Sequence, residues 1–217
     1  QKNPVHQYTA AGPYNVRLTV TSNNGCVDDS IKVMNTIYPQ PKLSVSAPVE
    51  KCFGDSVRVA IKINTPAGLK ITDYTCNWSN DAPTTGTMAA GADSIIVFHV
   101  FSNAGNQSVT VFVRSGTPGT CFSDTVTVPV YINRLPLPNY TIAPVSCAGE
   151  VVSFTDLSSS ADGAINKWKW IFGNTLVSSL QNPSTTYASP GTYTSSLQVE
   201  SNKGCISTVL SKPVVVN

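Results

Sequence analysis

Hydrophobic and polar residues alternate along several short stretches of this chain. In the first stretch the apolar positions stand two residues apart: Tyr14, Val16, Leu18 and Val20. This is the period of a β-strand with one face in the interior of a protein. Ser22-Asn23-Asn24-Gly25 then forms a turn signal, and residues 27–33 continue as a second strand. The pattern predicts a β-hairpin near the N-terminus.

The same pattern occurs again near the C-terminus, which indicates an internal repeat. The residues that recur 179 positions later, as Asn182-Pro183 through Gly204-Cys205, are Asn3-Pro4, Tyr8, Gly12, Tyr14, Leu18, Val20, Ser22-Asn23 and Gly25-Cys26. A weaker copy lies between them, where Gly105, Val109, Val111 and Val113 keep the same spacing. In that copy Cys121 takes the position of Cys26.

Two proline-containing segments, Tyr38-Pro39-Gln40-Pro41 and Leu135-Pro136-Leu137-Pro138, read as linkers. They predict domains at 1–39, 40–137 and 138–217. The second and third have the size and short strands of immunoglobulin-like sandwiches. The first has only the last strands of the pattern, so we expect the chain to begin inside a domain of a longer protein.

The strand positions follow from the alternation. They are predicted at 43–47, 56–63, 74–78, 94–101, 107–114 and 124–132 in the second domain and at 151–154, 167–172, 184–187, 192–199 and 206–216 in the third. The fold class is therefore all-β, with tandem sandwiches. Because proline restricts bending, we expect the short linkers to hold them end to end.

Composition narrows the class of protein. Of the 217 residues, 41% are hydrophobic and 12% charged, with 14 Lys+Arg against 12 Asp+Glu. Such a chain can build a core, which excludes intrinsic disorder. The basic residues form no cluster, which argues against nucleic acid as a partner. No stretch approaches the roughly 20 apolar residues of a membrane helix.

Six cysteines stand far apart, and no Cys-x-x-Cys pair suggests a zinc or redox site. An even number of widely spaced cysteines in a β-rich chain favours disulfides and therefore export. Buried free thiols in a cytosolic protein remain the alternative.

Three motifs of the third domain resemble the PKD (polycystic kidney disease) domain. They are Trp168-Lys169-Trp170-Ile171-Phe172-Gly173, Asn182-Pro183 with Tyr187, and Pro190-Gly191-Thr192-Tyr193. The family pattern is W-x-W-x-F-G-D-G, N-P-x-H-x-Y and P-G-x-Y-x-V. Here Asn174-Thr175 replaces the Asp-Gly, and Thr185 replaces the His. The first domain resembles the same family strongly, whereas the second domain resembles it only weakly.

The resemblance is to the PKD repeats of Bacteroidota cell-surface and secreted proteins, such as SprB-like gliding adhesins exported by type IX secretion. It implies an extracellular, cell-surface location and a non-catalytic segment that acts as a stalk, spacer or adhesive module, without cofactors. The implied partners are neighbouring repeats of the same protein and surface polysaccharide or another cell-surface component. An accessory polysaccharide-binding or spacer region of a secreted hydrolase is the alternative.

The resemblance also implies roles for particular side chains. Trp168 and Trp170, two apart on one strand, and Trp78 are expected in the core rather than on a sugar-binding surface. Tyr193 is expected at a corner of the sandwich, with its hydroxyl bonded to nearby backbone.

By alignment of the repeats with that family, Cys52 is expected to pair with Cys121, and Cys147 with Cys205. Cys26 is expected to have no partner in this chain, and Cys76 to be a buried thiol in the place of a tryptophan.

No motif for catalysis or metal binding is present. His6 and His99 lie in different domains, so we expect structural roles for both. The acidic residues Asp28-Asp29, Asp156 and Asp162 are too few and too scattered for the oxygen ligands of a calcium site.

Four times an Asp precedes Ser or Thr and then an aliphatic residue, which resembles the O-glycosylation sequence of exported Bacteroidota proteins. The hydroxyl groups concerned are Ser30, Ser56, Ser94 and Thr125. Asp-Ser is also a common way to enter a strand, so a structural explanation stays open.

Overall fold

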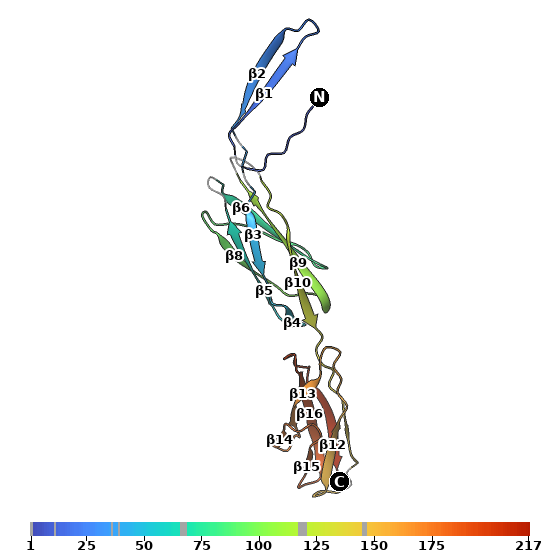
Figure 1. The fold of residues 1–217 in the computed structure, drawn as a ribbon. Coiled ribbons are helices and arrows are strands. Elements are labelled where there is room, and N and C mark those ends of the chain that lie inside the picture. The colour runs from blue at the N-terminus through green and yellow to red at the C-terminus, as the bar shows by residue number, and fades with distance from the viewer. Residues whose placement is uncertain are drawn as a thin grey trace. The chain divides into compact units, whose positions relative to one another are not determined.

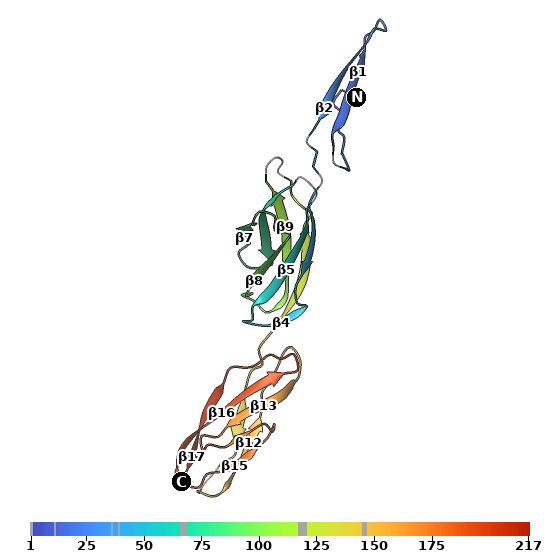
Figure 2. The ribbon, with the colours of Figure 1, turned by 90° about the vertical axis from the view of Figure 1, so that its left-hand side faces the viewer.

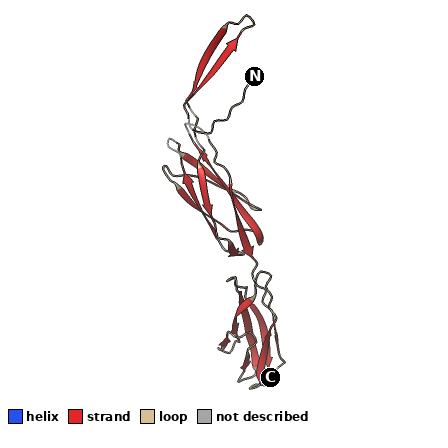
Figure 3. Cartoon of the chain, in the orientation of Figure 1, coloured by secondary structure: helices blue, strands red, loops and turns tan. Residues whose placement is uncertain are grey.

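The computed structural model describes residues 2–10, 12–35, 37–38, 40–65, 69–116, 121–144 and 147–217. Pro39, in the first predicted linker, lies outside them. The regular structure of the described residues consists of β-strands, and no helix occurs among them (Figure 3). The prediction of an all-β, immunoglobulin-like chain is confirmed. The domain boundaries at 39 and 137 stay predictions.

The chain folds into two compact units. The first comprises residues 1–47, 58–98 and 108–128, and the second comprises residues 48–57, 99–107 and 129–217. Two strands, β9 (Gly105–Ser115) and β10 (Val126–Asn133), run from one unit into the other.

The predicted N-terminal hairpin is confirmed. Strands β1 (Tyr14–Thr21) and β2 (Val27–Met34) pair antiparallel, with Thr21 opposite Val27 beside the turn (Figure 1). However, the apolar side chains of β1 are more exposed than a half-buried strand allows, since Leu18 keeps 62% of its surface accessible. Backbone hydrogen bonds along the ladder therefore hold this hairpin, rather than a core.

The middle strands form two sheets. The first has the order β3 (Lys42–Ser46), β5 (Val57–Asn64), β8 (Ser94–His99), and the second has the order β4 (Glu50–Cys52), β10, β9, β6 (Ile71–Trp78), β7 (Thr84–Thr87). The alternation seen in the sequence is a true burial pattern, because every second residue of β5 and β9 is buried. The short strands β4 and β7 are additional to those predicted.

The C-terminal strands, all in the second unit, also form two sheets (Figure 2). One has the order β11 (Tyr140–Ile142), β12 (Val151–Asp156), β15 (Ser184–Thr186), and the other has the order β14 (Val177–Ser178), β13 (Ile165–Ile171), β16 (Gly191–Ser201), β17 (Leu210–Val216). Neighbouring strands in both sheets pair antiparallel.

Aromatic side chains fill the core between these C-terminal sheets. Trp170 is fully buried, and its ring centroid lies 5.0 Å from that of Tyr140 and 5.6 Å from that of Phe154. Trp168 packs against this core but is only partly buried, and its indole Nε1 donates a hydrogen bond of 2.7 Å to Asp156. The prediction of core tryptophans is thus confirmed for Trp170, and for Trp78 in the middle strands.

The predicted tyrosine corner is confirmed. The hydroxyl of Tyr193 donates to the carbonyl of Ser189 at 2.9 Å. Its counterpart in the N-terminal repeat, Tyr14, donates to the carbonyl of Ala10 at 2.7 Å. The same local geometry therefore recurs in both copies of the sequence repeat.

Candidate functional site

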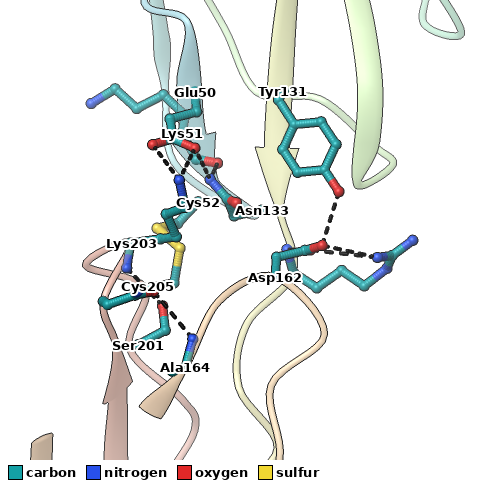
Figure 4. A network of polar contacts seen from close by, with 12 residues as sticks. Glu50, Lys51, Cys52, Tyr131, Asn133, Asp162, Ala164, Ser201, Lys203 and Cys205 are labelled. Atoms are coloured by element: carbon teal, nitrogen blue, oxygen red, sulfur yellow. Dashed lines mark hydrogen bonds and ion pairs between the residues drawn. A yellow bond between two sulfur atoms is a disulfide. The ribbon is translucent and has the colours of Figure 1, made fainter. Parts of the chain in front are cut away.

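The disulfide of the structure joins Cys52, at the end of β4, to Cys205, in the hairpin between β16 and β17 (Figure 4). Their Cα atoms lie 5.4 Å apart. Cys121 and Cys147 are free thiols. The predicted pairs Cys52–Cys121 and Cys147–Cys205 are therefore wrong.

The length of β16 keeps Cys147 away from Cys205. Next to Cys147, the amide of Ala148 donates to the carbonyl of Asn217, beyond the end of β17 that pairs with the start of β16. Cys205 follows the other end of β16, where its carbonyl accepts from the amide of Ser201. The 11 residues of β16 span about 35 Å, far more than a disulfide allows.

Strand β10 separates Cys52 from Cys121 in the same way. Cys52 pairs with Asn133, the last residue of β10. Cys121 precedes Val126, the first residue of this strand. The strand has eight residues, which span about 25 Å.

An ion pair lies beside the disulfide. Nζ of Lys203 lies 3.1 Å from both carboxylate oxygens of Glu50, and the buried Asn133 side chain donates to Glu50 at 3.3 Å. The hydrogen bond from Lys203, followed by that from Asn133, lowers the pKa of the Glu50 carboxyl below its usual value. These contacts, drawn in Figure 4, therefore hold Glu50 in its charged form.

A second acidic side chain binds the residues around the end of β10. The Asp162 carboxylate, whose side chain is only 7% exposed, accepts from the Tyr131 hydroxyl at 2.8 Å and from the Arg134 amide at 2.6 Å. The Arg134 guanidinium adds a contact of 3.2 Å. The Arg134 amide is the main cause of a lowered pKa for Asp162, and the bond to Asp162 raises the pKa of Tyr131.

Asn202 connects the loop of Asp162 to the hairpin of Cys205. Its amide donates to the carbonyl of Ala164 at 2.8 Å, and its side-chain oxygen accepts from the Ala164 amide at 3.2 Å. Gly163 has a φ of +105°, and a Cβ there would lie 2.3 Å from the Asn202 side chain. Only glycine fits this close approach.

These contacts all lie within the second unit, and we call them the junction site. Its residues are Glu50, Cys52, Tyr131, Asn133, Arg134, Asp162, Asn202, Lys203 and Cys205. The site fastens the C-terminal sandwich to β4 and the end of β10 by one covalent bond and two anchored carboxylates.

Of these residues, sequence patterns pointed only to the two bonded cysteines and Asp162. Asp162 was a candidate calcium ligand with too few acidic neighbours. Glu50, Asn133 and Lys203 carried no signal in the pattern. The one available signal was strand direction, since a cysteine just before β12 and one after β16 must lie at opposite ends of a sandwich.

The remaining cysteines are unbonded. Cys76 is fully buried, which confirms the prediction of a buried thiol, and burial raises the pKa of this thiol to about 11. The Cys26 thiol is exposed.

The four predicted glycosylation sites, Ser30, Ser56, Ser94 and Thr125, are all exposed. Ser94 donates to the neighbouring Asp93 carboxylate at 3.0 Å. Their glycosylation stays a prediction.

The histidines lie against aromatic rings. His6 makes an edge contact with Tyr8 at 4.7 Å, and His99 makes one with Phe101 at 4.9 Å. The described part of the chain holds no cluster of three or more His, Cys, Asp or Glu residues that could bind a metal ion. It also has no helix with the length and hydrophobicity needed to cross a membrane.

The sequence of the C-terminal sandwich matches a known family. The family model described as PKD domain covers residues 133–216, which contain the aromatic core and one half of the junction site. Residues 133–216 form a PKD domain. No curated protein matches the chain.

Several solved structures resemble parts of the chain. The PKD1 domain of Vibrio anguillarum Epp is 32% identical, with 39% of this chain and 99% of that chain covered and a TM-score of 0.35. The PKD1 domain from the Vibrio cholerae metalloprotease PrtV is 25% identical, with 38% of this chain and 98% of that chain covered and a TM-score of 0.35. The fibronectin(III)-like modules of Clostridium thermocellum CbhA are 14% identical, with 81% of this chain and 94% of that chain covered and a TM-score of 0.38.

The PKD domain departs from its family pattern at a tight turn. Asn174, in the place of Asp, donates to the carbonyl of Thr186 at 2.9 Å and accepts from the Leu176 amide at 3.2 Å, so the turn keeps its hydrogen bonds. Thr175, in the place of Gly, has a φ of +72°. A β-branched residue is strained in this conformation, which glycine adopts freely.

Proposed function

We propose that the chain is a non-catalytic, load-bearing spacer of an exported multi-domain adhesin. PKD domains occur in secreted or extracellular proteins, and PKD and immunoglobulin-like domains are typically non-catalytic modules. The observation that supports the proposal is the bond between Cys52 and Cys205, which closes a covalent loop over a sequence separation of 153.

The loop determines how the chain responds to tension. A pulling force that enters before Cys52 and leaves after Cys205 passes directly through the two sulfur atoms. The residues between the two cysteines then carry no load along the backbone, so they cannot be drawn out even if they unfold. At about 3.5 Å per extended residue, the bond withholds roughly 50 nm of chain. Such a spacer keeps its length under load.

Single-molecule stretching from the two chain ends tests this role. We expect the oxidised chain to release only the segments outside the loop. We expect Cys205→Ser to release about 50 nm more before it becomes taut. The matched control is Cys147→Ser, which removes an exposed thiol outside the bond and should stretch like the unmodified chain. Equal extension of the unmodified chain and Cys205→Ser would reject a load-bearing spacer.

Export and an adhesive role at the cell surface complete the proposal. Structural disulfides persist in oxidising compartments, and the exposed hydroxyls of Ser30, Ser56, Ser94 and Thr125 are accessible to a glycosylating enzyme. We propose that the parent protein is a Bacteroidota surface protein of the gliding-adhesin type, exported by type IX secretion. Protease treatment of intact native cells should remove the protein, and the intact mass of native protein should exceed that of the bare polypeptide.

A second candidate function is an accessory region of a secreted hydrolase. The match to a domain of a metalloprotease supports it, and so does a groove of about 420 Å³ lined in part by the aromatic residues Tyr74, Phe112 and Phe122. Aromatic rings beside the Asp73–Arg114 ion pair are suited to a sugar. Retention of the chain on immobilised polysaccharide, with loss of retention in Phe122→Ala, would favour this function. The control is Phe98→Ala, which removes an exposed aromatic side chain outside the groove lining and should leave retention unchanged.

A further inference from the structure

Each half of the Cys52–Cys205 bond recurs elsewhere in this chain. The first half is the hairpin Ser201-Asn202-Lys203-Gly204-Cys205, and its copy is Ser22-Asn23-Asn24-Gly25-Cys26. In both hairpins the Ser amide donates to the Cys carbonyl, at 2.9 and 2.8 Å, and the Gly amide donates to the Ser carbonyl at 2.9 Å. The glycine φ angles are +78° and +82°. Cys26 and Cys205 are therefore presented by the same turn.

The second half is the turn Cys52-Phe53-Gly54-Asp55, and its copy is Cys147-Ala148-Gly149-Glu150. In both turns the acidic residue donates its amide to the Cys carbonyl, at 3.0 Å and 3.4 Å, and the glycine φ angles are +89° and +87°. A strand with a fully buried valine follows each turn, Val57 in β5 and Val152 in β12. Cys147 therefore stands where Cys52 stands.

We infer that Cys147 and Cys26 are the two halves of a further junction, formed between copies of this kind of module. Both thiols are exposed and unbonded, whereas their structural copies are bonded to each other. The turn cysteine of one module forms a disulfide with the hairpin cysteine of the next module. In an array of such modules, each disulfide joins one module to the next. A pulling force would then pass through disulfides along the whole array, as the proposed spacer function requires.

A second molecule of this chain supplies the required partner, Cys26 for the Cys147 of the first molecule. The reaction is thiol–disulfide exchange with a disulfide oxidant such as oxidised glutathione. The Cys147 thiolate attacks one glutathione sulfur and displaces the other glutathione as a thiolate. The Cys26 thiolate then attacks the Cys147 sulfur of the mixed disulfide and releases the second glutathione. Two cysteines are oxidised, one glutathione disulfide is reduced to two thiols, and the two cysteine protons pass to them.

One part of the junction site has no copy at Cys26. Asn24 occupies the position of Lys203, so the ion pair that Lys203 makes with Glu50 is absent there. The Cys26–Cys147 junction must therefore depend on the disulfide and on backbone shape, and we expect added salt to leave its yield unchanged.

Complementation between two variants tests the inference. Both carry Cys121→Ser, because the Cys121 carbonyl likewise accepts from a Ser amide, that of Ser115, at 2.9 Å. One variant adds Cys26→Ser and keeps Cys147, and the other adds Cys147→Ser and keeps Cys26. Cys26 and Cys147 are exposed and Cys121 is only partly buried, so both proteins should fold, which near-ultraviolet circular dichroism verifies.

With oxidised glutathione, we expect an equimolar mixture of the two variants to give a dimer on a non-reducing gel. We expect neither variant alone to give one. Peptide mass spectrometry of the dimer should show Cys147 joined to Cys26. Cys76→Ala, which removes the buried thiol without placing a hydroxyl in the core, serves as the control and should leave the result unchanged. A mixture that stays monomeric, or either variant dimerising alone to the same extent, would overturn the inference.

Discussion

The substitution Cys205→Ser should destabilise the PKD domain strongly. Strand pairing holds Cys52 beside Asn133 at the end of β10, so the bond ties residue 205 back to residue 133. When the PKD domain unfolds in the oxidised protein, the bond closes a loop of about 70 residues. The loop-entropy relation then gives a stabilisation of about 4 kcal/mol for this bond.

Hydrogen exchange measures this effect inside the PKD domain alone. Amides of β13 and β16 that exchange only through global unfolding should exchange about a thousandfold faster in Cys205→Ser, because each 1.4 kcal/mol changes the rate about tenfold. A reducing agent should produce the same acceleration in the unmodified chain. Cys121→Ser and Cys147→Ser, which remove free thiols, should exchange at the unmodified rate. If Cys147→Ser accelerates exchange as much as Cys205→Ser, the Cys52–Cys205 bond is not the source of this stability.

Three further substitutions test local features of the PKD domain. Thr175→Gly relieves the positive φ and should raise the free energy of unfolding by about 0.5–1 kcal/mol in urea titrations, whereas a lower value would contradict the strain. Burial raises the pKa of Tyr187 from 10.0 to about 12, so the native domain should lose about 3 kcal/mol of stability as the pH rises from 10 to 12. Tyr187→Phe should lack this loss. An identical alkaline transition in Tyr187→Phe would refute the assignment. The pKa of Asp162 is lowered from 3.8, so its stabilisation is complete above that value and disappears as the pH falls through the lowered pKa. The difference in urea midpoint between the unmodified chain and Asp162→Asn should therefore shrink below pH 4, and a constant difference would contradict it.

The strands and the hairpin could be predicted because each depends on a local pattern. Alternating apolar residues determine the two faces of β5 and β9, and the Asn-Gly and Lys-Gly turns close the N-terminal and C-terminal hairpins. The corner position of Tyr193 also follows from residues within four positions of it. The exposure of Leu18 could not be predicted, since alternation describes a face without showing what covers it.

The junction site could not be predicted because its partners are distant in sequence. Glu50 meets Lys203 across 153 positions, and neither residue belongs to a motif. Cysteine spacing likewise does not say at which end of a sandwich each thiol lies. The aligned repeats favoured Cys147–Cys205, whereas the direction of β16 places these cysteines a full strand length apart.

Non-reducing peptide mapping is the most direct test of the Cys52–Cys205 bond. The native protein is digested after free thiols are alkylated, and the cross-linked peptides are identified by mass spectrometry before and after reduction. We expect a peptide pair that contains Cys52 and Cys205 and separates on reduction. A pair that joins Cys52 to Cys121, or Cys147 to Cys205, would contradict the junction site and the load-bearing spacer built on it.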